Sequence, residues 1–167
     1  AMGATMATYC GQNVGAGQLD RLGRGMRACS LLGALYSVAA LGGMVLFSRS
    51  CAMLFLDPAE PELELLVSLT SQYILINSAF FLPLSLVNIV RFSIQGMGYS
   101  AFAILAGVLE MIARAGVAFF LVPTLGYAAA CFASPAAWIC ADLFLLPASL
   151  LCIHRLRQQI PASVPRP

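Results

Sequence analysis

Glu110 and Arg114 lie four residues apart in the middle of a stretch, residues 101–122, that holds no other charged residue. Residues at this spacing share one face of a helix, so the two side chains can pair. A stretch this long and apolar can span a bilayer, where burying a charge costs several kcal/mol. The pair therefore needs a partner, a water-filled pathway or both. A role in helix packing and a role in transport are both open from these residues alone.

The composition is that of an integral membrane protein. The chain is 60% hydrophobic and 10% charged, with a mean hydropathy of +0.89, which a solvated globular surface does not accommodate. The net charge of +2 comes from arginine without any lysine, and it does not indicate a nucleic-acid partner. The predicted fold is all-α, a polytopic helix bundle that contacts membrane lipid.

Four stretches satisfy the requirement of about 20 largely apolar residues for a spanning helix. They are residues 28–47, 65–90, 101–122 and 128–152. Residues 1–10 are apolar but too short to span, and we interpret them as the end of a fifth helix. We therefore expect the chain to be the C-terminal piece of a longer protein. Residues 158–167 are predicted to form a cytoplasmic tail.

Arginines near the ends of the spans predict the orientation, because they are retained on the cytoplasmic side. Seven arginines lie before the first span, at the connection after the second span or after the last span. They are Arg21, Arg24, Arg27, Arg91, Arg155, Arg157 and Arg166. The loop predicted over residues 48–64 holds Arg49 and four acidic residues, and should face outward. The C-terminus is thus expected in the cytoplasm.

Helical phase, at about 100° per residue, predicts which faces are buried. In the third span, one face collects Ala103, Ala106, Gly107, Glu110, Ala113, Arg114 and Val117. The second span carries a polar stripe that includes Asn77 and Asn88 and continues to Arg91 at its end, and Pro83 lies between the two asparagines, where it can bend the helix. The last span carries Asp142 on a polar face. Each of these polar residues can either bond a neighbouring helix or contact an ion or a substrate.

Catalysis has little support in the sequence. The glycines at 11–17 lack the spacing of a dinucleotide-binding turn, and the absence of lysine excludes a Walker motif. The single histidine forms neither a Ser-His-Asp set nor a metal cluster. The six cysteines show no C-x-x-C spacing, so we expect neither disulfides nor a metal site. No cofactor is predicted.

Several short motifs resemble one transporter family. Gln12, Asn13 and Gly15 resemble the Gln-Asn-x-Gly-Ala signature in the second half of the MATE (multidrug and toxic compound extrusion) exporters. Gln95, Gly96 and Gly98 resemble the Gln-Gly-x-Gly turn between that family's tenth and eleventh helices. Residues 107–114 and 135–138 resemble its eleventh and twelfth helices. The resemblance covers residues 1–157, in the family's order and spacing.

The resemblance implies a plasma-membrane protein of twelve helices in two lobes, of which residues 1–157 supply the C-terminal lobe. It would export cationic or amphipathic compounds in exchange for sodium ions or protons, the coupling ion being transported and not held as a cofactor. Glu110 would be the coupling carboxylate, with Arg114 as its partner, and Asn77, Asn88 and Asp142 would line the cavity. Some members carry an acidic ligand on helix 10 where this chain has Leu84, so the coupling ion stays open.

Two alternatives stay open beside this reading. A lipid-linked oligosaccharide flippase of related architecture would use the same helices, but its cavity needs several cationic residues to hold a pyrophosphate. A non-transporting membrane subunit would use the polar stripes only to lock helices together.

Overall fold

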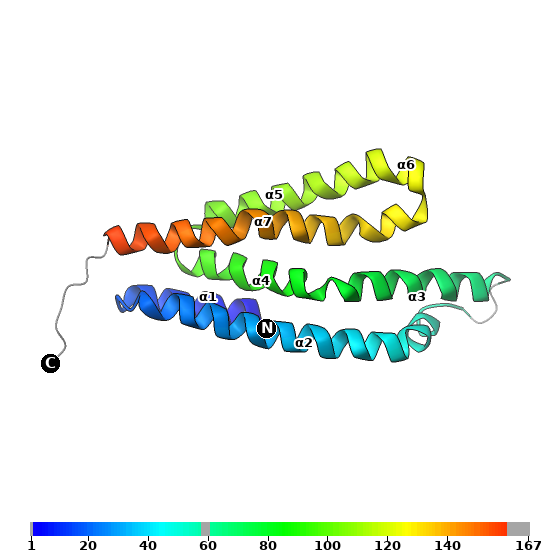
Figure 1. Ribbon diagram of the computed structural model, residues 1–167, viewed down its shortest axis with the longest axis horizontal. Helices are drawn as coiled ribbons and strands as arrows, with labels where there is room; N and C mark the ends of the chain where they lie inside the picture. Colours follow the sequence, from blue (N-terminus) through cyan, green and yellow to red (C-terminus); the bar gives the residue numbers. More distant parts are fainter. Residues whose placement is uncertain (1, 58–60, 160–167) are drawn as a thin grey trace.

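The computed structural model describes residues 2–57 and 61–159, which form a bundle of helices (Figure 1). In chain order the elements are α1 (Met2–Gly15), α2 (Asp20–Met53), α3 (Leu63–Ala79), α4 (Phe81–Gly96), α5 (Ser100–Gly116), η1 (Val117–Leu121), α6 (Val122–Leu125) and α7 (Tyr127–Gln159). No strand occurs within these residues. The predicted all-α class is confirmed.

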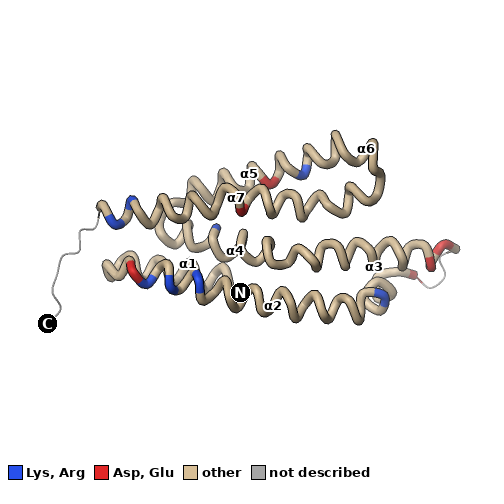
Figure 2. Tube along the Cα trace, viewed as in Figure 1, with Lys and Arg blue, Asp and Glu red and all other residues tan. Residues whose placement is uncertain are grey.

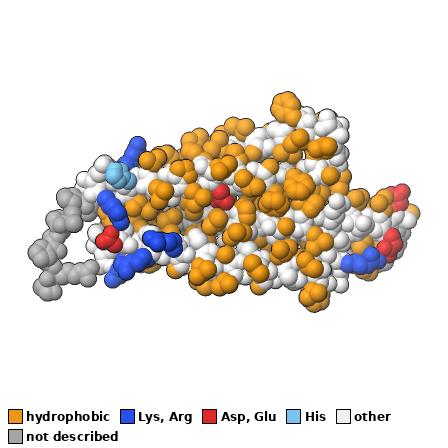
Figure 3. All heavy atoms as spheres, viewed as in Figure 1, with side chains coloured by type: hydrophobic (Ala, Val, Ile, Leu, Met, Phe, Trp, Pro, Cys, Tyr) orange, Lys and Arg blue, Asp and Glu red, His pale blue; other side chains and the backbone are white. Residues whose placement is uncertain are grey.

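The long helices have the length and hydropathy to cross a bilayer. Three pass this test: α2, the continuous segment Ser100–Leu125 and α7. The pair α3 and α4 passes as one span bent by 51°, which makes up to four spans in the described residues. On the face shown in Figure 3, hydrophobic side chains cover the middle of the bundle, and the charged side chains gather mainly at its two ends. The chain is a polytopic helical membrane protein.

The helices α2 and α7 run beyond their apolar stretches. Helix α2 begins at Asp20 and continues to Met53, so it includes Arg49. The prediction that Arg49 lies in a loop is therefore wrong, because backbone hydrogen bonding continues past the point where hydropathy falls. Arg49 pairs with Glu64 at 2.8 Å, and both side chains are exposed.

The break between α3 and α4 follows from Pro83. Proline has no N–H, so the carbonyl four residues earlier, on Ala79, loses its helical donor. Helix α3 ends at that residue, and α4 begins at Phe81. The kink expected in the second span is thus present, and it divides the span into two helices.

Close helix contacts depend on glycine. A Cβ added to Gly96 of α4 would lie 2.2 Å from the Ala7 carbonyl oxygen of α1, and one added to Gly11 of α1 would lie 3.3 Å from the Gly96 carbonyl oxygen. A Cβ on Gly33 of α2 would lie 2.2 Å from the Ser85 hydroxyl of α4. Small residues that let backbones approach in this way are typical of membrane helix interfaces.

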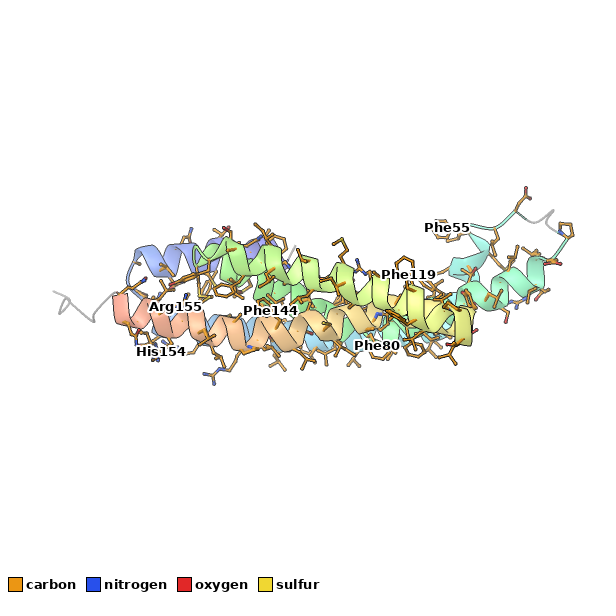
Figure 4. All side chains as sticks on the ribbon, turned by 90° about the horizontal axis from the view of Figure 1, so that it is seen from above. Phe55, Phe80, Phe119, Phe144, His154 and Arg155 are labelled. Carbon is orange, nitrogen blue, oxygen red and sulfur yellow. The ribbon has the colours of Figure 1, made fainter. Side chains whose placement is uncertain are left out.

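Charge is distributed unequally between the two ends (Figure 2). The start of α2 and the end of α7 lie together at one end and carry arginines, with Arg157 bonded to Asp20 at 3.0 Å. His154 and Arg155 are exposed on the last turns of α7 (Figure 4). The other end carries acidic residues, and there Arg49 pairs with Glu64. This separation of arginines from acidic residues matches the pattern that predicts a cytoplasmic C-terminus.

Candidate functional site: a buried ion-pair cluster

Charged residues of α4, α5 and α7 lie midway along the bundle, where these three helices pack together (Figure 2). Arg91 of α4 donates a hydrogen bond to Oε1 of Glu110 on α5. Arg114, one turn further along α5, donates to Oε2 of Glu110 at 3.4 Å. The side chain of Glu110 is only 11% exposed. One buried carboxylate thus accepts hydrogen bonds from two guanidinium groups.

The helical phase of α5 places Glu110 in the interior. Ala103, Ala106, Glu110 and Val117 are buried, as the sequence predicted for this face. Leu105 and Ile112, on the other side, are exposed to the surroundings of the bundle. Arg114 departs from the prediction, because its side chain is 47% exposed and only its guanidinium reaches back to Glu110.

Arg91 is the partner that sequence reasoning missed. It was expected at a connection between spans, but α4 continues to Gly96 and Arg91 lies within the helix, with its side chain 23% exposed. That expectation was wrong because the apolar run ends at Val90 while the helix does not. The polar stripe on this helix, which includes Arg91, was the available signal.

Asp142 of α7 is the second carboxylate of the cluster. It is 8% exposed, and its Oδ1 is buried without a hydrogen-bond partner in the described part of the chain. Arg91 interacts electrostatically with Asp142, and the Arg91 Nε atom is likewise buried and unpartnered. Buried polar groups are usually bonded, so an unsatisfied pair of this kind indicates a strained or functional position.

The two asparagines make only local hydrogen bonds in the described residues. The side-chain amide of Asn77 donates to the Tyr73 carbonyl at 2.9 Å, and that of Asn88 to the Leu84 carbonyl at 2.8 Å. Asn77 is buried, whereas Asn88 is exposed and lines a groove of about 750 Å³ between α1, α2 and α4. Neither is bonded to the charge cluster.

The motif residues lie at turns and at the contact between α1 and α4. Gly15 ends α1, and the following turn uses Gly17 at φ +67°. The side chain of Asn13 is buried and donates to the Tyr9 carbonyl at 2.8 Å, while Gln12 and Gln95 are exposed. Gly96 makes the close contact with α1, and Gly98, at φ +90°, forms the turn into α5. Both glycine turns need backbone conformations that other residues rarely adopt.

A π-helical segment, η1, directly follows the cluster on α5. It covers Val117–Leu121, and no pattern in the sequence predicts it. Such segments are rare and occur frequently at functional sites. It shifts the phase of the helix just beyond Arg114.

Residues 2–57 and 61–159 contain no assembled metal site and no disulfide. No group of three His, Cys, Asp or Glu side chains is placed to hold a metal ion there. All six cysteines are free, and three of them are buried among apolar side chains. The charged cluster, with two cations and two carboxylates, is the arrangement suited to binding and releasing an ion.

Long apolar helices around a buried carboxylate and its ion pairs are typical of polytopic membrane proteins with an ion or substrate pathway. The MatE family model matches residues 1–141, and the chain belongs to this family of MATE-type transporters, whose members are not enzymes. No curated protein and no solved structure matches the chain. The family predicted from the motifs is confirmed.

Proposed function

We propose that the chain forms the C-terminal lobe of an exporter of cationic or amphipathic compounds, driven by exchange for sodium ions or protons. The observation that carries the proposal is the cluster of Arg91, Glu110 and Arg114, which has a buried carboxylate at its centre and links α4 to α5 within apolar helices. Ionisable groups within membrane spans are rare and typically belong to ion or substrate pathways.

The physical mechanism is alternating access. A cavity between two lobes opens to one side and then to the other, and an ion or a proton that binds one state more tightly shifts the equilibrium toward it. A change of charge within the cluster alters the attraction between α4, α5 and α7. The cluster thereby couples ion binding to the packing of three helices.

The charge balance favours this proposal over a flippase for lipid-linked oligosaccharides. Two guanidinium groups are present, which is more than the sequence indicated, but Glu110 accepts hydrogen bonds from both. Both guanidinium groups are therefore already paired with a carboxylate. A pyrophosphate needs unpaired cations, and this cluster offers none.

The same proposal places the protein in the plasma membrane, with its C-terminus in the cytoplasm. The arginines at the start of α2 and the end of α7 support this orientation. Membrane lipid surrounds the exposed apolar faces, and a second lobe of the same protein completes the cavity.

The test is transport by the full-length protein in lipid vesicles. An imposed sodium or proton gradient should drive accumulation of a fluorescent cation such as ethidium, and Glu110→Gln should abolish it at normal expression. Ser93→Ala is the matched control, because Ser93 is buried on α4, its hydroxyl donates to the Ile89 carbonyl of the same helix, and it makes no hydrogen bond to the charged cluster in the described residues. Wild-type transport by Glu110→Gln would remove Glu110 from the mechanism. A wild-type protein that moves no cation under either gradient would favour a non-transporting subunit.

A further inference from the structure

The two carboxylates of the cluster, Glu110 and Asp142, differ in the hydrogen bonds that they accept. Glu110 accepts hydrogen bonds from two guanidinium groups, one at each oxygen. Asp142 is more than nine-tenths buried, and its Oδ1 has no donor in the described residues. Nearby opposite charges favour the ionised form of a carboxylate, whereas burial without a partner favours the neutral form. The two groups therefore suit different roles.

We propose that Asp142 is the carboxylate that binds and releases the coupling proton, and that Arg91 is the cation that Glu110 and Asp142 share. The inference rests on the exporter function proposed above and specifies its coupling ion and the site of that ion. It assigns Glu110 a positioning role, because its two hydrogen bonds hold the arginines in place.

The surroundings of Asp142 suit a proton better than a metal ion. Of the groups on the helices that pack against α7, Arg91 of α4 interacts with Asp142, and Glu110 and Arg114 of α5 complete the cluster. Helix α3 contacts α7 instead near Tyr127, where the Tyr127 hydroxyl donates to the Leu69 carbonyl at 2.8 Å. Two guanidinium groups repel a sodium ion, but a proton forms a covalent O–H bond on a single carboxylate oxygen and needs no set of ligands.

One proton is taken up and one is released at Asp142 in each cycle. A proton taken from water on one side of the membrane forms an O–H bond on Asp142, which becomes neutral, and Arg91 then pairs with Glu110 alone, as in this structure. When the proton leaves to water on the other side, the ionised Asp142 attracts Arg91, whose buried Nε is unpartnered. Arg91 then bridges α4 to α7 as well as to α5.

Infrared spectroscopy on the full-length protein in lipid tests the proton site directly. A protonated carboxyl group has a C=O stretching band that a carboxylate lacks, so lowering the pH should produce such a band from Asp142. The band should be missing in Asp142→Asn and kept in both Glu110→Gln and Ser149→Ala. Ser149 is the matched control, because it is buried on α7 and its hydroxyl bonds its own helix.

Three infrared results would overturn the inference. These are a band retained in Asp142→Asn, a band lost in Glu110→Gln instead, and no pH-dependent band at all. If Asp142→Asn does not fold, Asp142→Glu replaces it, because a glutamate carboxyl group shifts the frequency of the band. An unshifted band in Asp142→Glu would equally contradict the assignment.

Transport separates this inference from the exporter function itself. A pH gradient should drive accumulation of ethidium in the wild type and in Ser149→Ala, and Asp142→Asn should lose it. Accumulation by Asp142→Asn, or by the wild type under a sodium gradient alone, would contradict the proton site and leave the exporter function standing. Failure of the wild type under every gradient would instead refute the exporter function, while the infrared result would still decide whether Asp142 titrates.

Discussion

Replacing Gly96 by alanine should separate α1 from α4. The added Cβ would lie 2.2 Å from the Ala7 carbonyl oxygen and 2.8 Å from the Ala7 Cα, both of them backbone atoms that no side-chain rotation can move. Ordinary contact begins at 3.4 Å, so the helices must part by about 1.2 Å, the difference from 2.2 Å. Overpacking of this kind costs about 1–3 kcal/mol.

The cost should appear as a lower free energy of unfolding of the purified full-length protein, measured by sodium dodecyl sulfate titration in mixed micelles. Gly42→Ala is the control, because Gly42 lies within α2 and nothing stands within 4 Å of its added Cβ. Both substitutions add one methyl group to a helix, Gly42→Ala in the interior of α2 and Gly96→Ala at the last residue of α4, and only Gly96→Ala places that methyl group against another backbone. A Gly96→Ala protein as stable as Gly42→Ala would refute the close approach of α1 and α4.

Three further predictions concern the cluster, the bend and the charged end of the bundle. Glu110→Gln should lower the free energy of unfolding by about 1–3 kcal/mol, because the mostly buried Arg91 loses its carboxylate partner while Arg114 remains half exposed, and adding Arg91→Gln should recover part of this loss. Pro83→Ala should reduce the 51° bend between α3 and α4, which lengthens the distance between spin labels at the outer ends of the two helices. Arg157→Gln breaks an exposed ion pair with Asp20 and should change the free energy of unfolding by no more than about 1 kcal/mol.

Each of these three predictions has a result that would contradict it. Additive losses from Glu110→Gln and Arg91→Gln would show that the two side chains do not interact. An unchanged label distance in Pro83→Ala would mean that the packing of α3 and α4, and not the missing N–H, sets the bend. A large loss of stability in Arg157→Gln would mean that its side chain is buried in the assembled protein.

The sequence predicted the parts of the site that depend on local periodicity. The buried face of α5 follows from the spacing of Ala103, Ala106 and Glu110, and the break near Phe80 follows from Pro83. Both are properties of a single helix, for which phase and proline chemistry are sufficient.

The features that the sequence did not predict depend mainly on contacts between residues that are distant in sequence. Arg91 was assigned to a connection because hydropathy falls at that residue, but the partner that stabilises it inside the helix, Glu110, lies on α5. The contact of Gly96 with α1 likewise needs the relative placement of two helices, which no local pattern contains. The π-helical segment after Arg114 has no composition that separates it from the α-helix around it.

The proposed transport mechanism requires water to reach the charged face of α5 in the assembled protein. Arg114 and Ile112 lie two residues apart on different faces, and both are exposed in this chain, with their exposed fractions at 47% and 57%. In full-length protein lacking the native cysteines, a membrane-impermeant maleimide should modify Arg114→Cys from at least one side of the membrane and should not modify Ile112→Cys, which faces lipid. If Arg114→Cys is as unreactive as Ile112→Cys from both sides, the cluster lies in a dry helix contact, and the transport mechanism assigned to it is wrong.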